Sequence, residues 1–181
     1  YEQMAETRPM LVLELPQKAE RAEGLEQWTE ELRKLRMELG ARLGVDVSDA
    51  KIRRAIDLLN RERGLRRRLA ALMTSSAPPL TGRQLLEMKS IISCIPEHLD
   101  RYERVLSELE GREGPEEASG RVRVLLTGVA VPHGAERVVE IIEDHGGLIV
   151  ATENCTGLKP IEDDVDPGAA DPVRALAEKY Y

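Results

Sequence analysis

In the second half of the chain, two short apolar runs flank an amphipathic segment. The runs, Val122–Leu126 and Leu148–Ala151, are rich in β-branched residues, and the segment between them is Ala135–Asp144. This order predicts a β-α-β unit with adjacent parallel strands, because a crossover through one helix usually joins neighbouring strands. The second run leads into residues 153–157, Glu-Asn-Cys-Thr-Gly. Ligands of open α/β sheets bind beyond the carboxyl ends of the strands, so we expect Cys155 to lie at such a site.

The preceding stretch, residues 19–111, has a helical pattern. Apolar residues recur there at alternating steps of three and four, beginning with Leu25, Trp28, Leu32, Leu35 and Leu39. This spacing is typical of helices that pack closely in antiparallel pairs. The predicted helix boundaries use residues that favour caps and breaks: Gly44, Ser48 or Asp49, Pro78-Pro79, Thr81 and Pro96.

The pattern divides the chain into four parts. Residues 1–18 contain an apolar run predicted to be a strand, residues 19–111 are helical, residues 112–120 form a polar linker, and residues 121–181 form the α/β region. In the last part Asp171 is an expected N-cap, since Pro172 suits the first helical position. A lone strand cannot satisfy its own backbone groups, so we expect the chain to be a fragment of a longer protein.

Composition narrows the function classes. The chain has 26 basic and 33 acidic residues and a net charge of −7, which argues against nonspecific nucleic-acid binding. No apolar run approaches the length that a transmembrane helix needs, so no membrane partner is expected. The 2 cysteines are too few for a disulfide scaffold and fit a reducing, cytoplasmic location.

A run of arginines lies in the predicted helical region: Arg53, Arg54, Arg61, Arg63, Arg66, Arg67 and Arg68. Acidic residues interleave with them at Asp57 and Glu62, which is typical of a solvated helix face. The alternative interpretation is a grip on a coenzyme phosphate or an acidic partner protein. Nucleic acid is disfavoured because no aromatic stacking platform lies nearby.

Three further features invite chemical interpretations. Gly128 to Gly134 forms a strand-to-helix loop that could attract an anion, although the three-glycine dinucleotide spacing is absent. His133 in this loop is a cap or loop residue more often than a catalyst. Cys94 lies among apolar residues and is interpreted as core packing.

Cys155 is either a small buried residue or a metal ligand. Its neighbours favour the ligand: Asn154 can fix the loop, and Thr156-Gly157 permits a tight turn whose N–H groups are free to point at an anionic sulfur. Hydrogen bonds of this kind tune iron–sulfur clusters. One cysteine cannot hold a metal alone, so the sequence points to a site that this chain does not complete.

Several segments together resemble a known family: Leu13–Pro16, Leu125–Gly128, Val138–Asp144, Gly146-Gly147, Glu153–Gly157 and Asp166–Tyr181. They resemble the D-component subunits of 2-hydroxyacyl-CoA dehydratases and benzoyl-CoA reductases, most closely the branch of double-cubane-cluster proteins. The resemblance covers nearly the whole chain, and the Asn-Cys-Thr-Gly loop is its most specific part. Leu13–Pro16 corresponds to the last strand of the family's first domain.

The resemblance implies an α/β fold in which a helical region is followed by a Rossmann-like or flavodoxin-like parallel unit, as a fragment of a larger two-domain subunit. It implies an anaerobic iron–sulfur lyase or reductase with a 4Fe-4S or double-cubane cluster. The implied partners are an ATP-dependent activator iron–sulfur protein and a related subunit, in a homo- or heterodimer.

Only Cys155 carries over as a cluster ligand, and the implied loop residues around the cofactor are Asn154, Thr156, Gly157, Gly128 and His133. The other ligands lie outside the chain, so the fragment alone is expected to be inactive and cluster-free. The alternative hypothesis is a non-catalytic helical interaction module, joined to a small α/β unit that binds CoA or a nucleotide through the Gly128–Gly134 loop.

Overall fold

The computed structural model describes residues 7, 10–17, 22–90, 95–132 and 134–181. Their contacts divide the chain into two units, Tyr1–Asp57 with Val165–Tyr181, and Leu58–Asp164. Cys94 and His133, both named as candidates above, lie outside the described residues. The four-part domain division inferred from the sequence stays a prediction.

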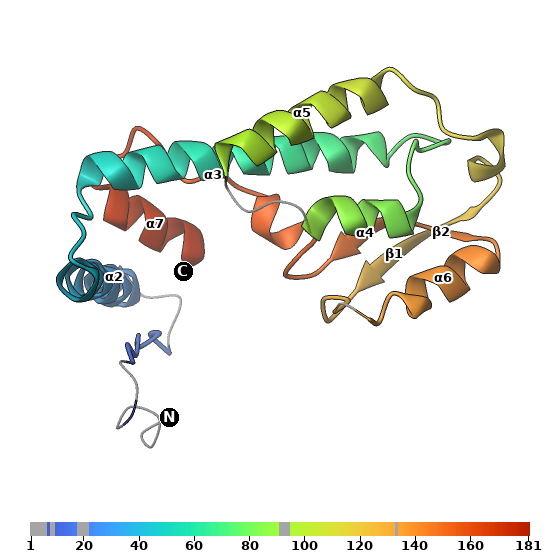
Figure 1. The fold of residues 1–181 in the computed structure, drawn as a ribbon. Helices are drawn as coiled ribbons and strands as arrows, with labels where there is room; N and C mark the ends of the chain where they lie inside the picture. The colour runs from blue at the N-terminus through green and yellow to red at the C-terminus, as the bar shows by residue number, and fades with distance from the viewer. Residues whose placement is uncertain (1–6, 8–9, 18–21, 91–94, 133) are drawn as a thin grey trace. The chain divides into compact units, whose positions relative to one another are not determined.

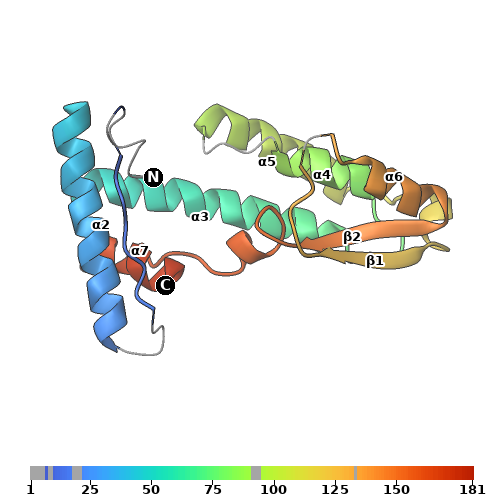
Figure 2. The same cartoon turned by 90° about the horizontal axis from the view of Figure 1, so that it is seen from below.

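In the first unit, helix α2 (Ala22–Leu43) packs against α7 (Pro172–Tyr180) (Figure 2). Trp28 of α2 is buried. Gly44 follows α2 with a φ of 64°, a left-handed conformation that favours glycine, so the predicted end of this helix is confirmed.

Helix α3 (Asp49–Leu72) begins in the first unit and continues into the second. Its first turns bury Ile56 against Val165 and Ala175 of the same unit. Arg53 donates to the carbonyl oxygens of Pro167, Ala169 and Ala170 at 3.2, 2.7 and 2.8 Å, which fixes the chain leading into α7.

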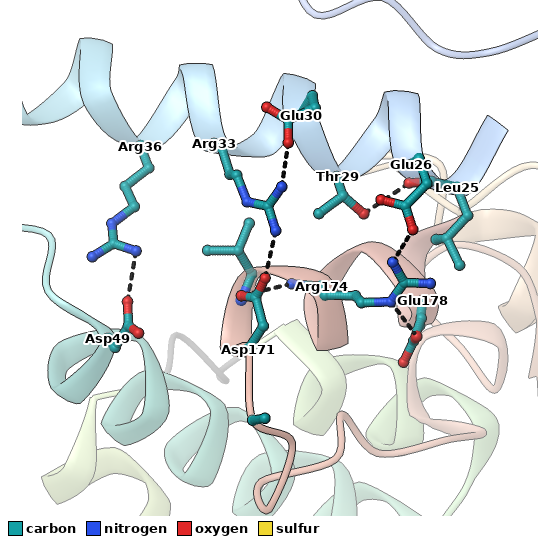
Figure 3. Close-up of polar contacts among 12 residues, drawn as sticks. Leu25, Glu26, Thr29, Glu30, Arg33, Arg36, Asp49, Asp171, Arg174 and Glu178 are labelled. Carbon is teal, nitrogen blue, oxygen red and sulfur yellow. Dashed lines mark hydrogen bonds and ion pairs between the residues drawn. The ribbon is translucent and has the colours of Figure 1, made fainter. Parts of the chain in front are cut away.

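Polar contacts join α2 to α7 (Figure 3). Asp171 Oδ1 accepts hydrogen bonds from the backbone N–H groups of Val173 at 2.9 Å and Arg174 at 3.2 Å, which confirms the predicted N-cap. Arg33 of α2 donates to the other carboxylate oxygen of Asp171 at 2.6 Å, and Arg174 pairs with Glu26 of α2. The first turn of α7 is therefore both capped and tied to α2.

The core of the second unit is formed mainly by the end of α3, by α4 (Gly82–Ser90) and by α5 (Pro96–Glu110), which are labelled in Figure 1. The unit also contains α6 (Arg137–Asp144) and short 3-10 turns at Glu116–Ala118 and Lys159–Ile161. The core residues are Leu65, Leu69, Met73, Leu80, Leu85, Leu99, Tyr102 and Leu106. With no phenylalanine in the sequence, aliphatic side chains fill most of this core.

Helix α4 begins where the sequence predicts. Thr81 Oγ1 accepts from the N–H of Gln84 at 3.2 Å, and Gln84 Oε1 accepts from the N–H of Thr81 at 2.9 Å, so the two side chains form a capping box. The Glu143 carboxylate of α6 accepts from the N–H of Gly82 at 2.6 Å, which ties α4 to α6.

The sheet has two parallel strands, β1 (Val122–Thr127) and β2 (Gly147–Glu153), joined through α6. The register runs from Val122 opposite Gly147 to Thr127 opposite Glu153. The predicted adjacent parallel strands are confirmed, with both strands longer than the apolar runs that revealed them. The mixed helical and parallel-sheet architecture also confirms the predicted α/β class.

Residues 10–16 form neither helix nor strand in this structure. The strand expected within residues 1–18 was assigned to a preceding domain, so it stays a prediction. A strand needs a neighbour to satisfy its backbone groups, and a local apolar run does not supply one. No helix among the described residues combines the length and apolarity that crossing a membrane requires.

Candidate functional site

The two strands deliver their loops to one edge of the sheet. Thr127 and Glu153 are opposite each other in the register, so Gly128 and Asn154 are the next residues beyond the same carboxyl edge. Gly128 has a φ of 104° and open space around it, consistent with a loop that turns away from the sheet. The structure thus brings the two sequence-predicted loops to one place.

Asn154 organises the loop after β2. The residue is only 2 % exposed, and its Oδ1 accepts from the N–H of Thr156 at 3.1 Å and from the Thr156 hydroxyl at 3.0 Å. Its carbonyl oxygen accepts from the N–H of Gly157 at 3.0 Å. The prediction that Asn154 fixes the loop is confirmed. The prediction that the N–H groups of Thr156 and Gly157 are free is wrong, because Asn154 takes both.

Gly157 is required by close packing against β2. A Cβ atom there would lie 1.9 Å from the carbonyl oxygen of Thr152 and 2.5 Å from its hydroxyl oxygen. The N–H of Leu158 also donates to that carbonyl at 2.9 Å. The loop therefore folds back onto the end of β2, and no side chain fits at position 157.

Cys155 is exposed and has a free thiol. Its neighbours on both sides are fixed by the contacts of Asn154 and Gly157, so the backbone holds the cysteine while its side chain faces solvent. The interpretation of Cys155 as a small buried residue is wrong. An exposed thiol on a fixed loop is suited to bind a metal or to react.

Two arginines of α3 hold the segment that follows β2. Arg66 Nη2 donates to the carbonyl oxygen of Thr156 at 2.6 Å. Arg67 donates to the carbonyl oxygen of Ile161 at 2.8 Å and pairs with Asp164 at 2.9 Å. The sequence left the role of the arginine run open. These contacts explain part of it, because the guanidinium groups donate to acceptor atoms of the chain itself.

Two further arginines of α3 reach α5. Arg61 pairs with Asp100 at 2.6 Å and with Glu103 at 2.8 Å, and Arg68 pairs with Glu110 at 2.9 Å. The hydrogen bond from Arg68 holds the pKa of Glu110 below its usual range. The solvated-face interpretation is therefore incomplete, since these side chains join helices as well as facing water.

The space behind the loop is small. A hollow of about 10 Å³, lined mainly by Arg66, Leu69, Leu85, Val150 and Gly157, could hold about one water molecule. It has no room for a nucleotide or CoA. In the loop after β1, the Glu136 carboxylate accepts from the N–H of Gly134 at 2.7 Å, so one of the expected anion-binding N–H groups already has a carboxylate partner.

The described residues do not complete a metal site. They contain no group of three or more His, Cys, Asp or Glu side chains that could hold a metal ion. Thiolates are the usual ligands of iron–sulfur clusters, and Cys155 offers one in an accessible position. Cys155 could supply one ligand to a cluster, but it cannot hold one by itself.

These features define an α/β protein in which a fixed, thiol-bearing loop stands beyond the carboxyl edge of a parallel sheet. The chain belongs to the family of 2-hydroxyglutaryl-CoA dehydratase D-components, which matches residues 1–181. It is also 32 % identical over 188 residues to YjiM of Escherichia coli (strain K12), a protein named as a dehydratase subunit. That match covers 99 % of this chain and 48 % of YjiM, so the chain spans about half the length of this curated relative. The resemblance to the D-component family inferred from the sequence is confirmed, whereas the double-cubane branch stays a prediction.

Proposed function

We propose that this chain is part of a dehydratase subunit that acts on 2-hydroxyacyl-CoA thioesters, in which Cys155 is one ligand of an iron–sulfur cluster. The observation that carries the proposal is the geometry of Cys155: an exposed thiol on a pinned loop beyond the carboxyl edge of the sheet. Family membership supports the dehydratase class. The cluster is a 4Fe-4S or a double-cubane cluster, and its other ligands lie outside this chain.

The residues of the chain have distinct roles in this proposal. The Cys155 thiolate binds iron, and the amide of Asn154 holds the loop in which the exposed thiol lies. Gly157 lets the loop lie against β2, where any larger residue would collide with Thr152. When bound, the cluster supplies one-electron chemistry and an iron atom that can engage the substrate.

The partners follow from the same proposal. The one-electron chemistry of the cluster requires a donor that supplies an electron at low potential. We propose that this donor is an ATP-hydrolysing activator with its own cluster. The subunit pairs with a copy of itself or with a related subunit in the cytoplasm. Whether the assembled protein works as a lyase or as a reductase depends on residues outside this chain.

The proposal is tested in the full-length protein purified without oxygen. Cys155→Ala should remove most of the bound iron and the visible absorbance of the cluster, together with dehydratase activity. Cys94→Ala is the matched control, and it should keep the iron and lose only about 1 kcal/mol of stability. A Cys155→Ala protein with its full iron content would refute the assignment of this ligand.

A further inference from the structure

Arg66 is more buried than the three neighbouring arginines of α3 that pair with α5 or Asp164, although Arg63 is more buried still. The Arg66 side chain is 13 % exposed, whereas those of Arg61, Arg67 and Arg68 are 36–38 % exposed. Its acidic neighbour Glu62, at 3.5 Å, is equally buried. The Nε atom of Arg66 has no hydrogen-bond partner in the described part of the chain. At this burial little solvent screens the guanidinium, and the Glu62 carboxylate offsets part of its charge.

The contacts of Arg66 converge on the cysteine loop. Its Nη2 group donates to the carbonyl oxygen of Thr156, the residue directly after Cys155, and the side chain lines the small hollow beneath Gly157. On the other side of the cysteine, Asn154 binds the N–H of the same threonine. The peptide groups of Thr156 are thus held at both ends, by Asn154 at its nitrogen and by Arg66 at its carbonyl.

We propose that Arg66 is a positioning residue for the Cys155 ligand: its hydrogen bond to Thr156 sets the direction of the thiolate, and its positive charge raises the reduction potential of the cluster bound there. This inference rests on the proposed function. A cation near a cluster favours the reduced form, which carries one more negative charge. Groups that orient a ligand from outside the coordination shell also strengthen metal binding, typically by about 10–100-fold.

The test uses the full-length protein loaded with iron under anaerobic conditions. Arg66→Met removes both the hydrogen bond and the charge, and Arg66→Lys keeps the charge without the planar fork of donors. Arg68→Met is the matched control, because Arg68 lies on the same helix but binds Glu103 and Glu110 of α5. The readouts are the rate of iron release to a chelator and the midpoint potential from a titration followed by electron paramagnetic resonance.

We expect Arg66→Met to release iron about tenfold faster or more and to shift the midpoint potential to a more negative value. Arg66→Lys should keep a potential close to that of the wild type while still releasing iron faster, and Arg68→Met should change neither readout. Unchanged iron release and potential in both Arg66 variants would overturn the inference, as would equal changes in Arg68→Met. Iron retained in Cys155→Ala would instead refute the proposed function, so the two failures are distinguishable.

Discussion

Asp171 combines two stabilising roles that substitutions can separate (Figure 3). One carboxylate oxygen caps α7 through two backbone N–H groups, and the other accepts from Arg33 of α2. Loss of an N-cap lowers stability by about 1 kcal/mol. The ion pair adds little, because the side chains of Arg33 and Asp171 are 41 % and 37 % exposed and water screens them.

Asp171→Ala should therefore lower the free energy of unfolding by about 1 kcal/mol, whereas Asp171→Asn should lower it much less, because asparagine caps as well as aspartate. Urea unfolding followed by tryptophan fluorescence is the appropriate assay. Trp28 is the 1 tryptophan of the sequence and is buried in α2, which packs on α7. The emission therefore reports on the unit that contains the substitution.

The pH dependence gives a second check. Burial raises the pKa of Asp171, but the hydrogen bonds from Arg33, Arg174 and Val173 outweigh it and leave the pKa below its ordinary value of 3.8. A carboxyl group with a lowered pKa stabilises the fold above its ordinary value and loses that effect as the pH falls through the lowered pKa. The difference between wild type and Asp171→Asn should therefore shrink in acid. Equal losses in the alanine and asparagine variants at neutral pH would refute the capping argument.

Two further substitutions test the second unit. Gly157→Ala should displace the cysteine loop, because the added Cβ would overlap Thr152. The chemical shifts or the protease sensitivity of the loop should then change. Gly120→Ala is the control and should leave both unaltered, because the space around Gly120 is open. Leu99→Ala should lower the free energy of unfolding by about 2–5 kcal/mol, since Leu99 is 0 % exposed in the core, while Val105→Ala on the same helix, 37 % exposed, should have a small effect in the same circular-dichroism melt.

The elements that the sequence predicts well have local signals. The N-cap at Asp171 precedes Pro172, Thr81 starts α4 with a glutamine three positions later, and both strands are short branched runs around an amphipathic helix. The caps need only neighbouring residues, and each strand has its partner just across one short helix, so the structure confirms these predictions. The thiol beyond β2 was predictable for the same reason, because the strand and its loop are contiguous.

The features that escaped prediction depend on distant partners. Arg66 binds a carbonyl oxygen 90 residues away, and Arg53 reaches one 117 residues away, so their spacing along α3 gives no sign of either contact. Backbone carbonyls occur at every position and leave no compositional trace. The strand predicted before Pro16 also depends on a distant partner: its pattern is local, but a strand is stable only beside another strand, and residues 10–16 form neither helix nor strand here.

Because of its arginine contacts, helix α3 depends more on the exact number of its residues than on which side chains it carries. Arg61 and Arg68 lie two turns apart and reach α5, while Arg66 and Arg67 reach the segment after β2. Inserting one residue at Gly64 would rotate everything beyond it by about 100° relative to what precedes it. The carbonyl of Thr156 would then lose its donor, although every arginine would still be present. For this helix a single-residue insertion is a graver change than a substitution at an exposed position.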